Sequence, residues 1–336
     1  MKIIYLSYWG FSDGLTQSSV LPHLKVLAAK AYIDQIVFLT IERKDDTSTG
    51  EIQIPKVFHQ PLYSQNLKIG LFNKVNDFRI FTKQIVRIVK EYNIDEILCR
   101  TSLAGSLGYL ASRKTQTPYH VESFEPHADY MLDGKVWARW GFKYLFQKYW
   151  EYQIIETAQS VVTVSEFFTN RIKTRTRGQV YTFACAVDHE KFKFSEAKRR
   201  TTRSRLGILD SETVGIYVGK FGDIYYDHKA FEIFREVFNQ IPDFRLIVLT
   251  PQDKSWVCDR FKDFEIELKK CHVARVPHDE VSEYLSASDF AFSMVRPSPV
   301  RLYCSPIKDG EYWANGLTIF SLMVLAKIVV LLKQRM

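Results

Sequence analysis

The chain lacks any arrangement of cysteines that would indicate a disulfide framework or a zinc site. Its five cysteines are scattered over 336 residues, and none belongs to a CxxC pair or a Cys/His cluster. Their odd number and wide spacing predict reduced thiols in a cytosolic protein. The first residues, MKIIYLSYWGFSDG, hold only a short apolar run that ends in aromatic residues and glycine. Without a small-residue cleavage site, this run predicts a first β-strand and not a secretory leader.

Motifs for nucleic-acid binding and for metal binding are also lacking. The formal net charge is +8, and the basic residues concentrate in RIKTRTRG and EAKRRTTRSR. Such runs are most often solvated faces, but an anionic membrane surface fits them as a partner. No nucleic-acid partner is expected, because no recognition motif accompanies the charge. No Asp-x-Asp or other ligand cluster follows a predicted strand, so we expect no metal and no cofactor.

What the chain does contain is a regular alternation of short apolar runs and longer segments of helical period. It is 46% hydrophobic and 25% charged, as expected of a folded protein, and its length favours two domains. The alternation predicts a parallel sheet covered on both faces. The predicted strands are KIIYLS, QIVFLT, EILCR, YHVES, SVVTV and VYTFA, followed later by VGIYVG, FRLIVL, HVARV, FAFSM and GLTIF.

The alternation pauses at a polar, basic stretch without apolar periodicity. We therefore predict a first domain over residues 1–187, a basic interdomain segment over 188–206 and a second domain over 207–320. Residues 321–336 form an atypical apolar tail. The pattern predicts an α/β protein with two doubly wound, Rossmann-type domains that face each other across a cleft. Ligands of such sheets bind beyond the carboxyl ends of the strands, so the loops after strands are the candidate sites.

Two loops of the first domain carry candidate groups. In SYWGFSDGLTQSSVLPHL, Gly14 permits a tight turn and Gln17 and Ser18 lie where the next helix begins. The amides of that helix start favour an anionic or sugar ligand, but a capped turn between strand and helix is the simpler explanation of the loop. In YHVESFEPHADYM, a strand runs into Glu122 and then His127. A histidine can act as acid, base or donor near neutral pH, but it can also be structural.

A loop in the second domain places a cation directly after a strand. In VGIYVGKFGDIYYDHKAF, Gly219 and Lys220 follow the apolar run, and a helix is expected from about Asp227. Lysine is a compact point charge suited to phosphate. The alternative is a solvated lysine in a turn.

The segment SPIKDGEYWANGL predicts a helix with a functional start. Ser305 is a typical N-cap, Pro306 a typical first helical residue, and Gly316 is placed to end the helix. Lys308 and Glu311 are then neighbours on one face, where a salt bridge would contribute only about 0.2–0.5 kcal/mol. A ligand is the other explanation, because amides at the helix start can receive phosphate and a carboxylate can accept hydroxyl protons. That division suits a nucleoside diphosphate and its ribose.

Five segments in order resemble family 4 of the retaining glycosyltransferases, which have the two-domain GT-B fold. They are DGLTQSSVLPHL, SVVTVSEFF, ACAVDHEKF, YVGKFGDIYYD and SPIKDGEYWANGL, and the resemblance runs from about residue 1 to 319. It implies that Lys220, Ser305 and Pro306 lie near the diphosphate and that Glu311 holds the ribose hydroxyls. His127 is similar to the catalytic-side histidine, although its loop has extra residues.

The chain departs from the family pattern at several positions. Tyr303 stands eight positions before Glu311, where the family often has an acidic residue, so a carboxylate near the reacting sugar is not assured. Thr318 replaces a proline, and Gly222-Asp223 replaces a Gly-Gly.

The end of the chain departs most, because FSLMVLAKIVVLLKQRM replaces a Gly/Asp-rich loop and further β-α units. One back-translation of Ser321 to Val329, read two bases on, encodes Ser-Asp-Gly-Val-Gly-Glu-Asp-Ser, which suggests a frameshift and an incomplete second domain. A membrane segment is the competing explanation. The 16 residues from Leu317 to Leu332, interrupted by Lys327, fall short of the roughly 20 needed to span a bilayer, which favours surface association.

The helical segment KVWARWGFKYLFQKYWEY has the composition of a membrane-interface helix. Its aromatics fall on more than one face, which favours packing within the first domain.

The sequence therefore predicts a cytoplasmic glycosyltransferase, or one peripheral to the inner face of the membrane. Its partners would be a nucleotide sugar and a glycan or lipid-linked acceptor, as in the assembly of cell-surface polysaccharide or glycolipid. Two alternatives stay open: a nucleotide-sugar epimerase on the same two-domain plan, and an inactive remnant that keeps the folded first domain.

Overall fold

The computed structural model describes residues 1–42, 52–64 and 70–321, which form two compact units. Unit 1 comprises Met1–Ala184 together with Leu302–Cys304, and unit 2 comprises Cys185–Arg301 and the chain from Ser305. The predictions made for the tail beyond residue 321, a frameshift or a membrane-surface segment, lie outside the described residues. Within these residues, no helix has both the length and the apolar character needed to cross a membrane.

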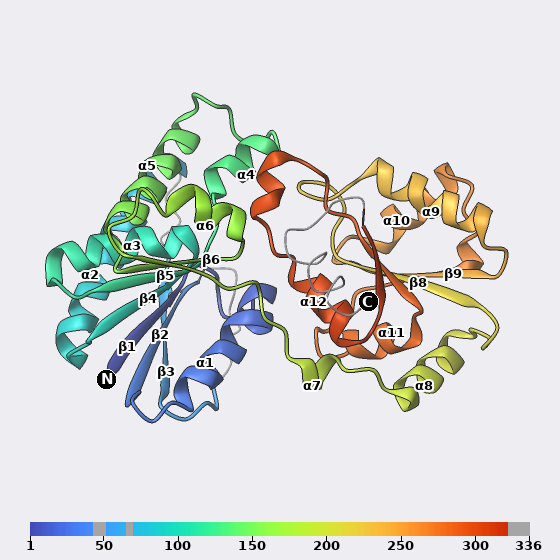
Figure 1. Ribbon diagram of the computed structural model, residues 1–336, viewed down its shortest axis with the longest axis horizontal. Helices are drawn as coiled ribbons and strands as arrows, with labels where there is room; N and C mark the ends of the chain where they lie inside the picture. The colour runs from blue at the N-terminus through green and yellow to red at the C-terminus, as the bar shows by residue number, and fades with distance from the viewer. Residues whose placement is uncertain (43–51, 65–69, 322–336) are drawn as a thin grey trace. The chain divides into compact units, whose positions relative to one another are not determined.

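Unit 1 is built on a seven-stranded parallel sheet with the order β3-β2-β1-β4-β5-β6-β7 (Figure 1). The sequence order of the strands reverses between β1 and β4, which is the doubly wound pattern. The strands are β1 (Lys2–Ser7), β2 (Gln35–Glu42), β3 (Val57–Tyr63), β4 (Glu96–Arg100), β5 (Tyr119–Phe124), β6 (Ser160–Thr163) and β7 (Gln179–Thr182).

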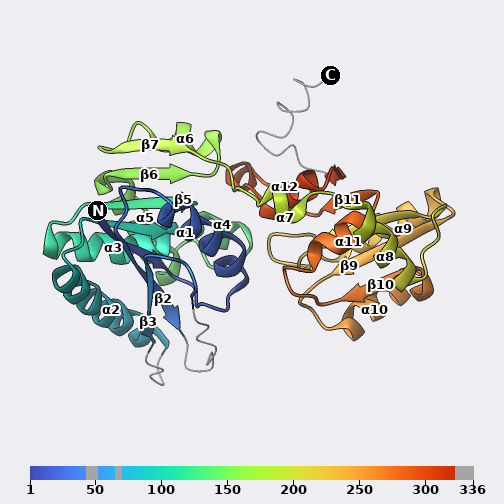
Figure 2. The ribbon, with the colours of Figure 1, turned by 90° about the horizontal axis from the view of Figure 1, so that it is seen from below.

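Helices cover both faces of this sheet because alternate residues of its strands are apolar in both directions. In β1, Ile4 and Leu6 pack on α2, α3, α5 and α6, whereas Ile3 and Tyr5 pack on α1. Figures 1 and 2 show these helices around the sheet. The helices of unit 1 are α1 (Leu21–Ala28), α2 (Gly70–Tyr92), α3 (Thr101–Thr115), α4 (His127–Asp133), α5 (Phe142–Thr157) and α6 (Glu166–Ile172), with the short π-helix η1 (Thr16–Val20) before α1.

One strand of unit 1, β3, does not follow from the apolar pattern. Its sequence VFHQPLY contains Pro61, which argues against a strand inside a sheet. The structure tolerates this proline because β3 lies at the edge of the sheet and pairs only with β2 among the described strands. All eleven strands predicted from apolar runs are present, with ends that differ by a few residues.

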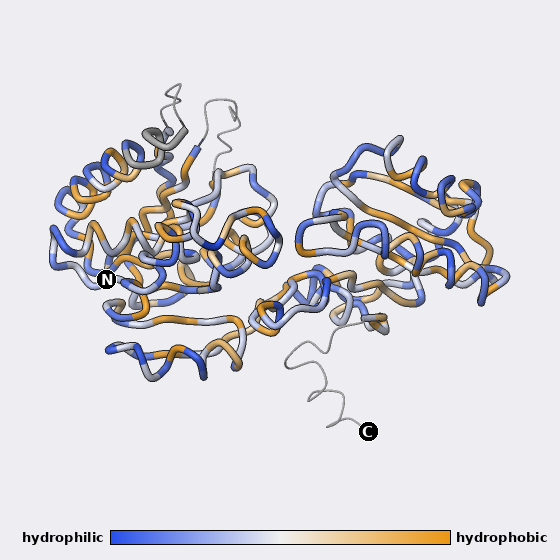
Figure 3. The backbone as a smooth tube through the Cα atoms, turned by 90° about the horizontal axis from the view of Figure 1, so that it is seen from above, coloured by the Kyte–Doolittle hydropathy of each residue, from blue (hydrophilic) through white to orange (hydrophobic). Residues whose placement is uncertain are grey.

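Unit 2 is built on a five-stranded parallel sheet with the order β10-β9-β8-β11-β12. Its strands are apolar, whereas its helices alternate between hydrophilic and hydrophobic residues (Figure 3). Helices α9 and α10 pack on one face, and α7, α11 and α12 pack on the other. The elements are β8 (Thr213–Val218), β9 (Phe244–Leu249), β10 (Cys271–Ala274), β11 (Phe290–Ser293), β12 (Thr318–Ser321), α7 (His189–Phe192), α8 (Glu196–Leu206), α9 (His228–Gln240), α10 (Lys254–Asp263), α11 (Val281–Ala287) and α12 (Ile307–Ala314), with the 3₁₀ turns η2 (Leu268–Lys270) and η3 (Pro299–Tyr303).

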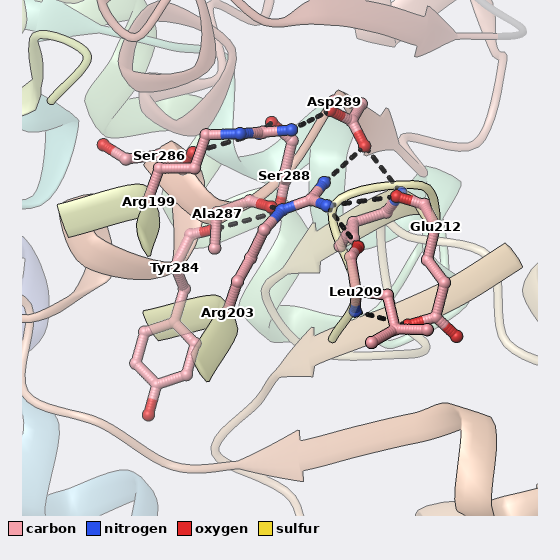
Figure 4. Close-up of polar contacts among 10 residues, drawn as sticks. Arg199, Arg203, Leu209, Glu212, Tyr284, Ser286, Ala287, Ser288 and Asp289 are labelled. Carbon is pink, nitrogen blue, oxygen red and sulfur yellow. Dashed lines mark hydrogen bonds and ion pairs between the residues drawn. The ribbon is translucent and has the colours of Figure 1, made fainter. Parts of the chain in front are cut away.

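The basic segment 188–206 is helical and belongs to unit 2, which corrects its interpretation as an interdomain segment. The buried guanidinium of Arg203 donates to the carbonyl of Ala287 at 2.9 Å and to Asp289 at 2.8 Å. Arg199 donates to the same carboxylate at 2.7 Å (Figure 4). The carbonyl groups at the end of α11 lack helical partners, and these arginines satisfy them. The sequence analysis interpreted this basic run as a solvated face, but two of its arginines form hydrogen bonds within unit 2.

Candidate functional site

The candidate residues of unit 2 lie where its strand order reverses, at the carboxyl ends of β8 and β11. Ligands of open parallel sheets bind at such a switch point. Helix α12 is hydrogen-bonded to the ends of both strands. The hydroxyl of Ser293, which ends β11, donates to Asp309 at 3.1 Å, and the amide of Val218, which ends β8, donates to the hydroxyl of Tyr312 at 3.0 Å. The first turn of α12 therefore faces the preferred ligand position of the sheet.

Lys308 places a buried cation in this position, in contact with two tyrosine rings but without a hydrogen bond among the described residues. Its Nζ lies 5.0 Å from the ring centre of Tyr217 and 3.8 Å from that of Tyr225, and it has no hydrogen-bond partner among the described residues. Burial lowers the pKa of Lys308 to about 8, although the negative charges of Asp309 and Glu311 act to raise it. A buried charge without hydrogen bonds destabilises a fold, so this ammonium is the group that an anionic ligand would satisfy.

Gly219 makes room for that ammonium. Its φ is +141°, which a residue with a side chain rarely adopts, and a Cβ at this position would lie 2.5 Å from Lys308 Nζ. The backbone conformation therefore requires glycine, and the missing side chain leaves the space that the lysine occupies. The structure brings together two residues that the sequence placed in different motifs, the strand tip and the helix start.

Lys220, the other lysine predicted at this site, is not buried as Lys308 is. Its side chain is 49% exposed and forms an ion pair with Asp223. The hydroxyl of Tyr217 donates to the backbone carbonyl of Lys220. The cation buried beside Gly219 is consequently Lys308.

The start of α12 differs by one residue from the prediction. Helical residues begin at Ile307, so Pro306 occupies the N-cap position and Ser305 lies outside the helix. The hydroxyl of Ser305 accepts a hydrogen bond of 3.1 Å from the amide of Cys185, and no side chain of the described residues caps the helix. The predicted helix end is confirmed, because Gly316 follows the C-cap residue with a φ of +82°.

Glu311 binds a histidine and does not form the alternative salt bridge with Lys308. Its Oε1 lies 2.7 Å from Nε2 of His278, and Nδ1 of that ring lies 3.1 Å from Nζ of Lys191, which also pairs with Asp279. Because an ammonium can only donate, Nδ1 accepts and Nε2–H donates to Glu311. The sequence analysis did not select His278 or Lys191. His278 lies in the loop after β10, so the rule on post-strand loops could have found it.

In unit 1, Glu122 is the centre of a buried hydrogen-bonded cluster near the β1/β4 switch point. It accepts hydrogen bonds from Tyr5 and, at 3.1 Å, from Arg100, and it lies 3.0 Å from Nδ1 of His23. Burial raises the pKa of Glu122, but the hydrogen bond and charge of His23 and the charge of Arg100 hold it below its ordinary value. Arg100 also donates to Ser19 at 3.1 Å, which ties the cluster to η1. In the described part of the chain, no group of three or more His, Cys, Asp or Glu side chains could hold a metal ion.

The other predicted residues of the first loop lie on or next to η1. Gln17 and Ser18 belong to this π-helix, and the side-chain amide of Gln17 donates to the carbonyl of Phe11 at 2.7 Å. Gly14 is exposed one turn earlier, with open space where a Cβ would be. Isolated π-helical turns occur frequently at functional sites. A site role for this loop stays a prediction.

His127 begins α4, directly after the loop that follows β5. Its ring lies 5.4 Å from that of Trp137 in an edge-to-face arrangement. Glu151 of α5 accepts a 2.8 Å hydrogen bond from the amide of Ala128, so α5 supports the helix start that carries His127. Burial raises the pKa of Glu151 to about 7, although the charge of Lys148 acts to lower it.

No protein-family model and no curated protein sequence matches this chain. Similar solved structures include sucrose-phosphate synthase from Thermosynechococcus elongatus, with a TM-score of 0.68, 14% identity and a match over 96% of this chain and 81% of that one. Anabaena Alr3699/HepE in complex with UDP-glucose is similar with a TM-score of 0.65 and 14% identity over 96% of this chain and 80% of that one. The chain has the GT-B fold. UDP-GlcNAc 2-epimerase from Neisseria meningitidis bound to UDP-GlcNAc is also similar, with a TM-score of 0.56 and 11% identity over 87% of this chain and 77% of that one. Membership of glycosyltransferase family 4 stays a prediction.

Proposed function

We propose that this protein is a retaining glycosyltransferase that moves a sugar from a nucleoside diphosphate sugar to an acceptor hydroxyl. The observation that carries the proposal is the buried ammonium of Lys308, which has no hydrogen-bond partner among the described residues and lies beside Gly219 at the switch point of unit 2. The similar fold of a protein in complex with UDP-glucose supports a nucleotide sugar as the ligand.

The first turn of α12 would bind the diphosphate together with Lys308. Amides of a first helical turn lack intrahelical acceptors and carry the positive end of the helix dipole. Charge that develops on the leaving diphosphate is stabilised by the same groups as the glycosidic bond breaks. Glu311, held through Oε1 by His278, would accept hydrogen bonds from the ribose hydroxyls with Oε2.

Unit 1 would supply the acceptor side. Gln17 and Ser18 on η1 and Glu122 beneath it belong to one region, because Arg100 bonds both the Glu122 carboxylate and η1. His127 would act near the reacting carbon. We propose a glycan or lipid-linked acceptor, in the assembly of cell-surface polysaccharide or glycolipid at the inner face of the membrane.

Calorimetric titration of the full chain with UDP and a panel of nucleotide sugars tests the donor assignment. We expect binding by the wild type and by Lys262→Met, which removes an exposed lysine paired with Asp259 on α10. Lys308→Met should lose about a hundredfold in affinity, because a charge-assisted hydrogen bond in a desolvated site contributes about 1.5–3 kcal/mol. Equal affinities of the two variants would contradict the site, and no binding of any nucleotide would favour the inactive remnant.

The similarity to an epimerase supports a second candidate activity, which product analysis separates from the first. A nucleotide sugar that binds is incubated with the protein without any acceptor, and the sugar is followed by NMR. Conversion into an epimer of the intact nucleotide sugar would favour the epimerase. We expect instead that the sugar leaves the nucleotide only when an acceptor hydroxyl is added.

A further inference from the structure

Helix α5 carries an exposed apolar stripe in addition to the face that packs in unit 1. Phe142, Leu145, Tyr149 and Tyr152 are 54%, 46%, 56% and 54% exposed, and Trp140, just before the helix, is 80% exposed. Spacings of three and four residues place the four helical side chains on one face. A continuous exposed stripe of this kind marks an interaction surface more often than single exposed side chains do.

The opposite side of α5 already forms its contacts with the core. Phe146 and Trp150 contact Phe78, and Ile154 is fully buried in the main core of the unit. The prediction that the aromatics of this segment pack within the first domain therefore holds for one face. The stripe from Phe142 to Tyr152 stays about half exposed, although Phe142 stacks on Phe146.

The charges around the stripe indicate the chemistry of a partner. Lys135, Arg139 and Lys143 are exposed, and Glu151, the only carboxylate between residues 135 and 152, is buried. Exposed aromatics that include tryptophan, interleaved with bases and free of exposed acids, suit the headgroup region of an anionic bilayer. The basic run of α8 suits a bilayer less well, because two of its arginines already form ion pairs with Asp289.

We propose that Lys135 to Tyr152, which we call the α5 surface, docks on an anionic lipid bilayer. Its aromatics would lie at the level of the headgroups while its bases contact lipid phosphates. Because Glu151 joins α5 to the start of α4, this surface is one hydrogen bond away from the helix that begins at His127. The inference stands on exposure and charge and does not depend on the donor assignment.

Co-sedimentation of the full chain with phospholipid vesicles tests the proposal. We expect binding to vesicles of phosphatidylcholine mixed with phosphatidylglycerol, weaker binding to phosphatidylcholine alone, and a decrease with added salt. The triple variant Trp140→Ser, Phe142→Ser, Tyr149→Ser should bind at least about tenfold more weakly, because its apolar contact is removed. The control variant removes exposed aromatics elsewhere in unit 1, namely Tyr32, Phe58 and Phe183, which are 62%, 58% and 64% exposed.

A charge variant separates the α5 surface from the general positive charge of the chain. Lys135→Gln, Arg139→Gln, Lys143→Gln should reduce binding about a hundredfold, since each base near the surface contributes about fivefold. The comparison variant neutralises Lys173 and Arg175, which are exposed in the RIKTRTRG run.

Three results would overturn the proposal. The first is unchanged vesicle binding by both α5 variants, with circular dichroism showing that they are folded. The second is an equal loss of binding in the control variants. The third is concentration-dependent self-association that the serine variant abolishes while vesicles are not bound, which would make a second copy of the chain the occupant of the surface.

Discussion

The two units contain the same kind of sheet, and each has a buried charge near its switch point, yet only one of these charges has hydrogen-bonded partners. Near the β1/β4 switch point, Glu122 is bonded by Tyr5, His23 and Arg100. At the β8/β11 switch point, Lys308 has no hydrogen-bond partner among the described residues. A charge whose partners the chain supplies contributes to the fold. A charge that the chain leaves unsatisfied is available to a ligand.

The pKa values of the two groups show the same contrast. Burial acts on both and disfavours the charged forms. For Glu122, the hydrogen bond and charge of His23 and the charge of Arg100 overcome burial and hold the pKa below its ordinary value. For Lys308, burial prevails over two nearby carboxylates and lowers the pKa to about 8. The carboxylate in unit 1 has hydrogen-bonded partners of opposite charge, whereas the ammonium in unit 2 has carboxylates nearby but no hydrogen bond among the described residues.

The largest expected effect comes from breaking the hydrogen-bonded cluster in unit 1. Glu122→Ala should lower the free energy of unfolding by about 3 kcal/mol, because it leaves the partly buried Arg100 and the buried hydroxyl of Tyr5 without their acceptor. Urea denaturation followed by circular dichroism measures this loss. Glu91→Ala is the control, since its partner Arg87 lies 3.9 Å away on an exposed surface and the pair should contribute less than about 0.5 kcal/mol. A loss as small as that of the control would mean that the cluster does not hold unit 1 together.

Removing the unsatisfied charge should have the opposite sign. Lys308→Met is expected to raise the free energy of unfolding by about 1–2 kcal/mol, since an apolar side chain of similar length replaces a buried ammonium without hydrogen bonds. The same denaturation experiment measures it in the absence of nucleotide. A destabilisation comparable to that of Glu122→Ala would show that Lys308 has a structural partner, and the comparison between the units would fail.

The free energy of unfolding of the wild type and that of Lys308→Met should depend differently on pH. Lys308 has a folded-state pKa of about 8 and an ordinary value of 10.5, so between these values the unfolded chain binds more protons. Wild-type stability should therefore rise relative to Lys308→Met as the pH increases from about 8 to 10.5, by at most about 1.4 kcal/mol per pH unit. Denaturation curves of both proteins over this range give the difference. A difference that does not change with pH would contradict the burial of the ammonium.

Much of the fold could be predicted from the sequence, because strands buried on both faces appear as apolar runs. Where the prediction failed, tertiary context outweighed a local rule. Strand β3 was not predicted because it contains Pro61, and the proline is tolerated because β3 lies at the edge of the sheet. Helix α8 was not predicted because its many charges resemble a solvated loop. A sequence does not show that Arg199 and Arg203 pair with Asp289 just after the end of α11.

The candidate site was predictable only in its local parts. Gly219 and Lys308 follow from the loop and helix patterns, but their contact depends on how α12 packs against β8. The pairing of Glu311 with His278 and Lys191 joins three separate segments, and charge spacing along a helix contains no information about it. For this reason the sequence analysis placed Lys220 beside the diphosphate and counted Lys308 only among the further donor-binding residues.

The smallest predicted effect is that of Lys220→Ala. Comparing it with Lys308→Met tests directly whether the exposed or the buried lysine binds the nucleotide. Lys220 is 49% exposed and paired with Asp223, so Lys220→Ala should change the free energy of unfolding by less than about 0.5 kcal/mol. Its effect on nucleotide affinity should be less than about tenfold, because an exposed charge is screened by water and salt. Calorimetric titration with the nucleotide that binds the wild type measures both lysine variants side by side. If Lys220→Ala weakened binding more than Lys308→Met, the exposed cation would be the principal anion ligand, and burial without a partner would no longer identify the site.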